Sequence, residues 1–414
     1  MSTTIALSST AKRDLILIAS ILIRFLLFQF DNVTEILGSR VEIVTPVTSF
    51  RRLTEGIYLF QNGVPPYDGG IFHQPPLLLP IFAYIPTILT PILYTCLDLV
   101  FAYLIQEITR IKQQLYKDCP RSDGDEGEIE PWVVAGCYLL NPLTIATCLS
   151  KSTVVFTNFA VVASVYYAMK GNRSYAMFGI AMATYLSLYP ITMVALIILL
   201  LNQNMPGKSI AVHCIILFIG WLSGLIGLSY LLVGSWDFLS ATYGFILLLS
   251  DLAPNIGLFW YFFIEMFDQF RNFFLVVFQL HTLIFAAPLT IKFRDHPLFA
   301  VFVLGGITAV FKSYPSIGDA SLYIAFLPIY SEIVNYMRYS FLITNIFLYS
   351  SLLAPIFYHL WIYAGSGNAN FFYAITLVYS IGNIVLLVDA TYAMLRREFD
   401  VRNPELKGRE VTQK

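Results

Sequence analysis

The sequence has little charge. Of its 414 residues 57% are apolar and only 12% are Asp, Glu, Lys or Arg, against about 25% in a typical soluble domain. The net charge of -1 offers no basic surface for a phosphate backbone. These values exclude an ordinary soluble enzyme, a disordered scaffold and a nucleic-acid-binding protein.

Patterns of catalytic and metal-binding residues are also missing. The five cysteines form no Cys-x-x-Cys pair, so neither a disulfide framework nor a zinc site is indicated. None of the five histidines neighbours a Cys or Ser in a recognisable nucleophile motif. We therefore expect no catalytic residue, no metal and no cofactor in this chain.

Long uncharged stretches dominate what is present. Residues 174–207, 209–236 and 339–388 contain no Asp, Glu, Lys or Arg. A membrane-crossing helix needs about 20 apolar residues, and several such lengths fit within these stretches. Because lipid leaves every backbone polar group to be satisfied internally, the sequence predicts an all-α, polytopic transmembrane bundle.

The placement of Lys and Arg sets the expected topology, with the basic loops on the cytosolic side. Residues 1–414 form a single membrane domain with both termini cytosolic. The segment 31–75 is a long first lumenal loop with an interfacial helix over 49–61, 111–131 is a cytosolic loop, and 394–414 is a cytosolic tail. We expect about twelve spans, near 14–30, 92–110, 132–149, 152–169, 174–188, 190–203, 209–233, 272–291, 296–311, 313–333, 340–363 and 370–393.

Two segments leave the topology open. Residues 76–90 are apolar but interrupted by prolines, and we favour a re-entrant piece over a full crossing. Residues 257–270 read as a short, partly inserted lumenal helix. The sequence does not decide whether either segment crosses the membrane.

Acidic residues offer weak candidates for glycosyl transfer. Asp123 and Asp125 spell Asp-x-Asp, but in an acidic run that is typical of a solvated loop. Glu42 and Asp68 in the first lumenal loop resemble the catalytic acids of membrane glycosyltransferases. An ion pair between Arg40 and Glu42 explains Glu42 equally well.

Polar residues inside apolar segments are candidates for function. Lys151 and Lys312 either face a lipid phosphate at the lumenal surface or extend to the interface without a ligand. Asp98 and Glu265 either pair inside the bundle or reach the interface.

The turn after the span 340–363 is rich in Gly and Asn. Asn368 and Asn370 each offer two N–H donors and a carbonyl acceptor, which suit sugar hydroxyls, and small residues around them let a ligand approach the backbone. The alternative is a simple turn in which Asn370 caps the following helix. Asn32 begins a lumenal glycosylation sequon whose use stays open.

Blocks along nearly the whole chain resemble the class U subunit family of the glycosylphosphatidylinositol (GPI) transamidase. They are RVE (40–42), PY (66–67), YLLNP (138–142), KST (151–153), SWDF (235–238), PNIGLFWYFF (254–263), FKSYP (311–315), WIYAGS (361–366) and LRRE (395–398).

This resemblance implies a non-catalytic subunit of an endoplasmic-reticulum complex that attaches GPI to proproteins. Catalysis would belong to the class K subunit; the other partners would be class S, class T and the GPI-anchor attachment protein. The family's architecture is mannosyltransferase-like. The resemblance assigns GPI binding to Asn368 and Asn370, and contacts to phospholipid head groups to Lys208, Lys292 and Arg294.

Two other functions stay open at this point. The first is a dolichol-phosphate-mannose-dependent GPI mannosyltransferase, with Glu42 or Asp68 as the catalytic acid. The second is a transporter or flippase, which only the many broken helices favour.

Overall fold

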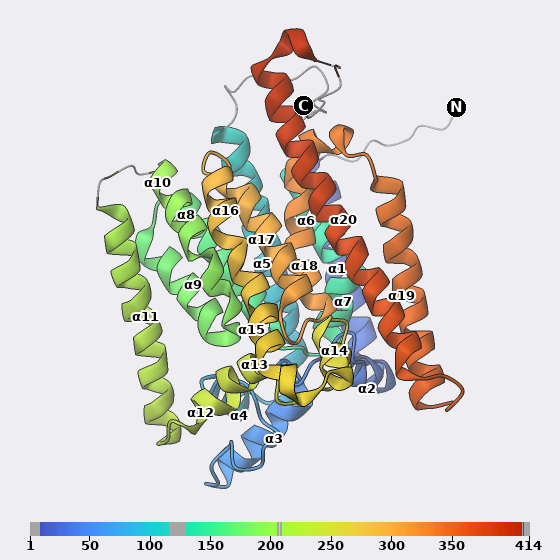
Figure 1. Cartoon of the computed structure of the whole chain (residues 1–414). Coiled ribbons are helices and arrows are strands. Elements are labelled where there is room, and N and C mark those ends of the chain that lie inside the picture. Colours follow the sequence, from blue (N-terminus) through green and yellow to red (C-terminus); the bar gives the residue numbers. More distant parts are fainter. Residues whose placement is uncertain (1–8, 116–128, 205–206, 208, 408, 410–414) are drawn as a thin grey trace.

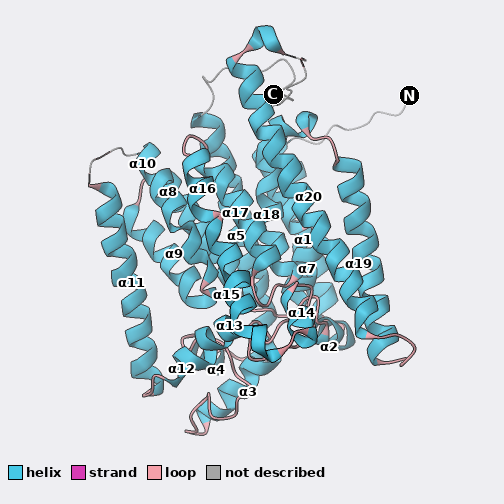
Figure 2. Ribbon diagram, viewed as in Figure 1, coloured by secondary structure: helices cyan, strands magenta, loops and turns pink. Residues whose placement is uncertain are grey.

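The computed structural model describes residues 9–115, 129–204, 207, 209–407 and 409, and these residues form helices and loops with no strand (Figure 2). Most long helices run between the two ends of one bundle (Figure 1). Helix α1 begins and α20 ends at one end, which we call the termini end. Short helices gather at the opposite end, which we call the loop end.

The longer helical segments of the described chain run between the two ends. They are α1 (Ser9–Phe28), α5 (Thr90–Leu115), α6 (Pro131–Leu139) with α7 (Pro142–Leu149), α8 (Val154–Met169), α9 (Arg173–Ser187), the 3-10 helix Tyr189–Met193 with α10 (Val194–Asn204), α11 (Ile210–Val233), α15 (Asp268–Ile284) with α16 (Ala286–Lys292), α17 (Pro297–Phe311), α18 (Ile317–Phe326) with the 3-10 helix Leu327–Tyr336, α19 (Ser340–Ile362) and α20 (Ala369–Arg402).

By length and composition, six helices of the described chain can cross a membrane, or up to eight if each of two bent pairs counts as one span. The bent pairs are α1 with α2, at 89°, and α6 with α7, at 51°. The chain is therefore a helical protein with several membrane-crossing segments. The expected count of about twelve is not reached by this measure, because α8, α9, α17 and the helix Tyr189–Asn204 are each shorter than a full crossing.

The short elements of the described chain lie mainly at the loop end (Figure 1). Helix α3 occupies the range where the spacing predicts a helix, and α4 has only seven residues, about 10 Å, which is too short to cross a bilayer. The short elements are α2 (Asp31–Ser39), α3 (Phe50–Gln61), α4 (Leu78–Tyr84), the 3-10 helix Thr87–Leu89, α12 (Asp237–Leu239), the π-helix Ser240–Gly244, α13 (Phe245–Leu248), α14 (Phe259–Glu265) and, at the termini end, the 3-10 helix Pro404–Leu406.

Small residues let α8 and α9 pack closely in the centre of the bundle. A Cβ on Gly179 would lie 2.9 Å from the backbone N of Ser164. The Ser164 hydroxyl donates to the carbonyl O of Ala176 over 2.8 Å. Close backbone approach with an interhelical hydrogen bond is how helices associate where lipid supplies no hydrophobic driving force.

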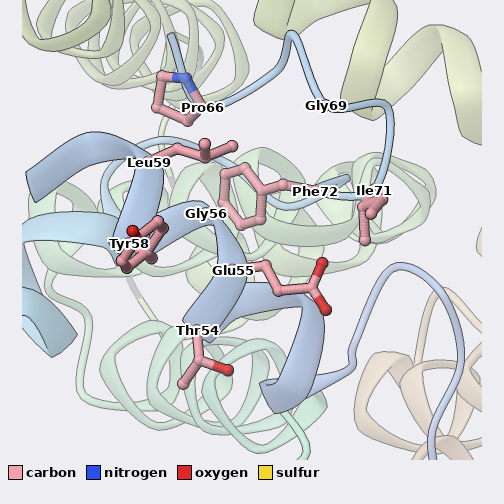
Figure 3. A pocket seen from close by; sticks show the side chains of 9 residues that line it. All are labelled: Thr54, Glu55, Gly56, Tyr58, Leu59, Pro66, Gly69, Ile71 and Phe72. Atoms are coloured by element: carbon pink, nitrogen blue, oxygen red, sulfur yellow. The ribbon is translucent and has the colours of Figure 1, made fainter. Parts of the chain in front are cut away.

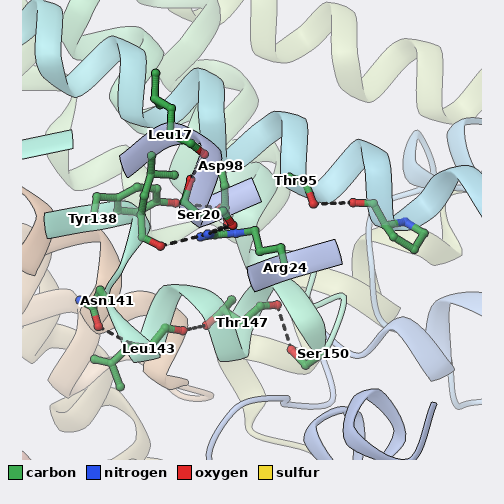
Figure 4. Close-up of polar contacts among 12 residues, drawn as sticks. Leu17, Ser20, Arg24, Thr95, Asp98, Tyr138, Asn141, Leu143, Thr147 and Ser150 are labelled. Atoms are coloured by element: carbon green, nitrogen blue, oxygen red, sulfur yellow. Dashed lines mark hydrogen bonds and ion pairs between the residues drawn. The ribbon is translucent and has the colours of Figure 1, made fainter. Parts of the chain in front are cut away.

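A buried ion pair joins α1 to α5 (Figure 4). Arg24 Nη2 lies 2.8 Å and Nε 3.0 Å from Asp98 Oδ2, and both side chains are almost fully buried. The Tyr138 hydroxyl donates to Asp98 Oδ1 over 3.1 Å, and Arg24 Nη1 donates to the carbonyl O of Leu139 over 3.0 Å. Of the two alternatives for Asp98, the structure therefore has the pair inside the bundle.

Helix α20 continues past 370–393, the range expected to cross the membrane. Arg396 lies 3.1 Å from Asp400, and Arg402 pairs with Glu398, each at i,i+4 spacing. Ion pairs at this spacing stabilise a helix. The first part of the tail expected at 394–414 is thus helical to Arg402.

Candidate functional site

The turn between α19 and α20 lies at the loop end (Figure 1). The N–H groups of Ser366 and Gly367 both donate to the carbonyl O of Leu360, each over 3.0 Å. Gly365 has φ +62°, the left-handed region that favours glycine. A Cβ on Gly367 would lie 3.3 Å from backbone atoms of Leu360 and Trp361. Glycine at these two positions therefore keeps the turn tight.

The two asparagines have different local roles. Asn368 is the N-cap of α20, where its Oδ1 accepts from the N–H of Phe371 over 3.4 Å. The alternative that Asn370 caps this helix is wrong, because Asn370 lies inside the first turn and accepts a hydrogen bond from the Tyr261 hydroxyl. Both residues are exposed, and within the described chain neither side-chain NH2 group donates a hydrogen bond. Both amides can donate to a ligand.

Trp260 holds this turn against α14. Its indole is fully buried and lies 6.1 Å from Trp361, 6.0 Å from Phe372 and 5.8 Å from Tyr373, measured between ring centroids. The Tyr373 hydroxyl donates to the carbonyl O of Leu258 over 3.2 Å. Aromatic side chains with polar atoms at their edges suit the boundary between lipid and water. The asparagines thus stand on a rigid aromatic base.

Arg40 and Glu42 lie beside the same aromatic cluster. The Arg40 guanidinium carbon is 5.1 Å from the centre of the Tyr358 ring, a cation–π contact, and Val41 packs against the cluster around Trp260. Arg40 Nη2 donates to Glu42 Oε1 over 2.6 Å, and Nε to Oε2 over 3.1 Å. Both carboxylate oxygens of Glu42 are engaged, which agrees with the ion-pair interpretation.

The sequence did not predict that these three segments lie together. Residues 40–42, α14 and the α19–α20 turn are far apart along the chain and meet only through the fold. The signal that could have found it is the clustering of aromatic residues at 259–263 and 371–373, each beside a polar turn.

The two lysines in apolar segments, Lys151 and Lys312, have different surroundings. Lys312 is almost fully buried and its Nζ lies 2.6 Å from Asp319, which also accepts from the N–H of Ser316 over 2.8 Å to cap α18. Lys312 is therefore committed to an internal ion pair. Lys151 has no acidic partner among the described residues; its Nζ lies 5.6 Å from the Phe50 ring centre, and its φ is +54°.

A groove lies along α3 at the loop end (Figure 3). Its volume is about 490 Å³, and Phe72 forms its floor against Gly56, where a Cβ would lie 2.7 Å from the Phe72 ring. Glu55 and Tyr58 line it, and the Tyr58 side chain is exposed. Asp68, the other candidate acid, is exposed on the neighbouring loop and is not among the lining residues.

His73 and Gln74 connect this loop to the bundle. The His73 ring stacks on Phe245 with centroids 3.6 Å apart, and Nδ1 lies 2.9 Å from the carbonyl O of Ala241. Burial lowers the pKa of His73 below its ordinary value of 6.5, so the ring is neutral at pH 7. Gln74 Nε2 donates to the carbonyl O of Ser49 over 2.7 Å.

The basic candidates lie at the opposite, termini end. Lys292 ends α16 and is exposed, and Arg294 follows in the turn to α17, with Nε 3.8 Å from Asp295. Gln203 Nε2 donates to the carbonyl O atoms of Arg294 (3.3 Å) and Asp295 (3.1 Å), which brings the end of α10 to this turn. Lys208 lies outside the described residues.

The described chain has no group of three or more His, Cys, Asp or Glu side chains that could hold a metal ion. Asp123 and Asp125 lie outside the described residues. Asn32 is exposed in the first turn of α2. Chemically, the α19–α20 turn offers amide donors and aromatic faces beside the engaged carboxylate of Glu42, groups that can bind a polar ligand.

Comparison with known proteins gives a consistent result. Residues 18–379 match the family described as GPI transamidase subunit PIG-U. The chain is 40% identical over 412 residues to the human GPI-anchor transamidase component PIGU, covering 93% of this chain and 94% of the human one. It is 38% identical over 382 residues to the GPI transamidase component GAB1 of Saccharomyces cerevisiae, covering 91% of this chain and 93% of the yeast one.

Proposed function

The chain belongs to the PIG-U family and is a subunit of the GPI transamidase complex, and we propose that within this complex it binds the glycolipid at the α19–α20 turn. One observation carries the proposal: two exposed asparagines present amide donors at the loop end, on an aromatic base that fixes their position. Sugar hydroxyls and phosphate oxygens accept from such donors, while the surrounding apolar helices contact the acyl chains.

The proposal also includes the topology of the chain in the membrane. Twelve spans with both termini cytosolic would place the loop end, and with it the asparagine turn, in the lumen of the endoplasmic reticulum. The support is that consecutive long helical segments run between the two ends of the bundle in alternating direction, while α4 and α14 are too short to cross. The basic residues Lys170, Lys292, Arg294 and Arg338 would then follow the positive-inside rule.

Within the complex the chain would contribute proximity rather than chemistry. Holding the glycolipid at a fixed place beside a catalytic subunit lowers the entropic part of the barrier. We assign catalysis to the class K subunit, and we expect class S, class T and the GPI-anchor attachment protein as the other partners. We keep Lys208, Lys292 and Arg294 as contacts to phospholipid head groups at the cytosolic surface. A mannosyltransferase mechanism through Glu42 is not favoured, since Arg40 engages both of its carboxylate oxygens.

The test is the double substitution Asn368→Ala with Asn370→Ala. Each lost hydrogen bond to the ligand corresponds to roughly 3- to 10-fold in affinity, so GPI attachment should fall about 10-fold or more while the complex still assembles. The measurement is the fraction of a reporter proprotein that carries GPI, together with co-purification of the other subunits.

Asn345→Ala is the matched control. Asn345 is half-buried on α19 near the termini end, and its side chain donates to the carbonyl O of Phe341 over 2.7 Å. Attachment should be normal in this variant. Normal attachment in the double variant would remove the asparagine turn from the glycolipid site.

A further inference from the structure

A second candidate site for a lipid lies on the opposite side of the bundle from the α19–α20 hairpin. It is an apolar groove of about 420 Å³ between α4, α5, α8 and α9, and no charged side chain lines it. Most lining side chains are only partly buried, so the groove is open along its length. Representative lining residues are Ile81, Leu97, Phe159, Ala163, Tyr175 and Met182.

The length of the groove indicates what kind of molecule it can bind. On α8 it runs from Phe156 to Tyr167 and on α9 from Leu186 to Tyr175, and eleven residues of helix correspond to about 17 Å. A single hydrocarbon chain of this length would run along α8 and α9 from the termini end towards α4 at the loop end.

The charges near one end of the groove indicate which lipid head group would bind there. The α8–α9 turn at the termini end carries Lys170 and Arg173, and in the described chain neither has an ion-pair partner. Lys170 Nζ lies 5.8 Å from the centre of the Tyr166 ring, which packs on Tyr167 with centroids 5.2 Å apart. Tyr167 in turn lies 5.1 Å from Tyr175 across the mouth of the groove.

The nearby acid does not cancel these charges. Glu107 faces Tyr166 from α5, but it forms an ion pair with Arg110 on its own helix. Lys170 thus lies beyond the end of an apolar groove, with tyrosines between it and the apolar lining, and Arg173 lies in the same turn, near Cys214 of α11. Cations of this kind attract anionic lipid head groups.

We infer that this groove holds one acyl chain of an anionic phospholipid whose head group lies against Lys170 and Arg173. The lipid comes from the leaflet at the termini end, which is the cytosolic leaflet in the topology proposed above. This site is separate from the asparagine turn, so it would be occupied whether or not glycolipid is bound.

The experiment is photo-crosslinking of the purified whole complex in vesicles of phosphatidylcholine that contain a small fraction of phosphatidylserine with a diazirine in one acyl chain. Mass spectrometry should find cross-links on α8 and α9 groove residues such as Phe159 and Met182. A phosphatidylcholine probe with the same acyl chain should give at least fivefold fewer of them. Equal labelling by the two probes, or labelling only outside α8 and α9, would overturn the inference.

Two variants test the two halves of the site. Lys170→Gln with Arg173→Gln should lower labelling by the phosphatidylserine probe at least fivefold, whereas Lys12→Gln, which removes an exposed cation elsewhere at the termini end, should not. Ala163→Trp should abolish labelling by filling the groove, and the glutamine pair keeps the test valid if the tryptophan variant fails to assemble. The extent of GPI attachment in the same preparations reports separately on the asparagine turn.

Discussion

The polar groups inside the bundle are hydrogen-bonded to one another, whereas the side-chain amide N–H groups at the α19–α20 turn are not bonded within the described chain. Arg24, Asp98 and Tyr138 are buried and bind one another across α1, α5 and α6. Asn368 and Asn370 are exposed, and their amide N–H groups point to no acceptor within the described chain. The interior polar groups therefore specify which helices meet, whereas those at the turn are left available to a ligand. Substitutions in the interior should reduce stability, and substitutions at the turn should reduce attachment.

The largest effect should come from Asp98→Ala. It leaves the Arg24 guanidinium buried without its counter-ion and Tyr138 without its acceptor, and breaking a buried pair in this way costs about 3–5 kcal/mol. The measurement is the thermal unfolding midpoint of the purified complex in detergent. An unchanged midpoint would mean that the pair does not hold α1 to α5.

The control for this prediction removes both charges. Arg24→Met with Asp98→Leu replaces the pair by apolar side chains, which is often neutral or stabilising. The double variant should therefore recover most of the stability that the single variant loses. If it is as unstable as Asp98→Ala, shape rather than charge decides the packing here.

A smaller effect is expected from Gly365→Ala in the asparagine turn. At φ +62° an L-residue costs about 1–2 kcal/mol, so the turn should relax and GPI attachment should fall while the complex remains assembled. Gly220→Ala on α11 is the matched control, since nothing lies within 4 Å of its added Cβ. In that helix, alanine should instead stabilise by about 0.5–1 kcal/mol. Equal midpoints for the two variants would show that the turn is not constrained.

The smallest effect should appear in the pH dependence near His73. Its folded pKa is lowered by burial, with Arg52 lowering it further and Asp251 opposing, so the unfolded chain binds the proton more readily. The contribution of His73 to stability is complete above the unfolded value of about 6.5 and is lost as the pH falls below it towards the folded pKa.

The measurement compares unfolding midpoints at pH 7.5 and pH 5.5 for the wild type and His73→Gln. The midpoint of the variant should depend less on pH. His296, whose pKa burial also lowers, titrates in both proteins and cancels in the comparison. An identical pH dependence in both would mean that His73 is not buried as a neutral ring.

Local patterns in the sequence predicted much of the fold. Each of the twelve apolar ranges lies mostly on helix in the structure, although residues 140–141 and 313–316 are not helical, and Arg40-Val41-Glu42 forms the ion pair that its spacing allows. These features depend on residues close together in the chain. Which helices are long enough to cross a membrane depends on where each begins and ends, and apolar composition did not determine that.

The candidate site was predicted only in part. Asn368 and Asn370 were found because they lie in one turn, but their division into a cap and an acceptor for Tyr261 depends on backbone angles and on α14. In the sequence, Lys312 has no evident acidic partner. In the structure, the turn before α18 brings Asp319, seven residues later, within ion-pair distance of it. Pairing between distant segments, such as Arg24 with Asp98, leaves no periodic signal in one sequence.

The pair of Arg24 and Asp98 also concerns biosynthesis. The two residues are 74 positions apart, and ribosomes add roughly 5–20 residues per second, so about 4–15 s separate their synthesis. During this interval the guanidinium near the end of α1 has no counter-ion, and an unpaired Arg in an inserted helix is costly. We therefore expect the first helix to become stable in the membrane only once α5 packs against it.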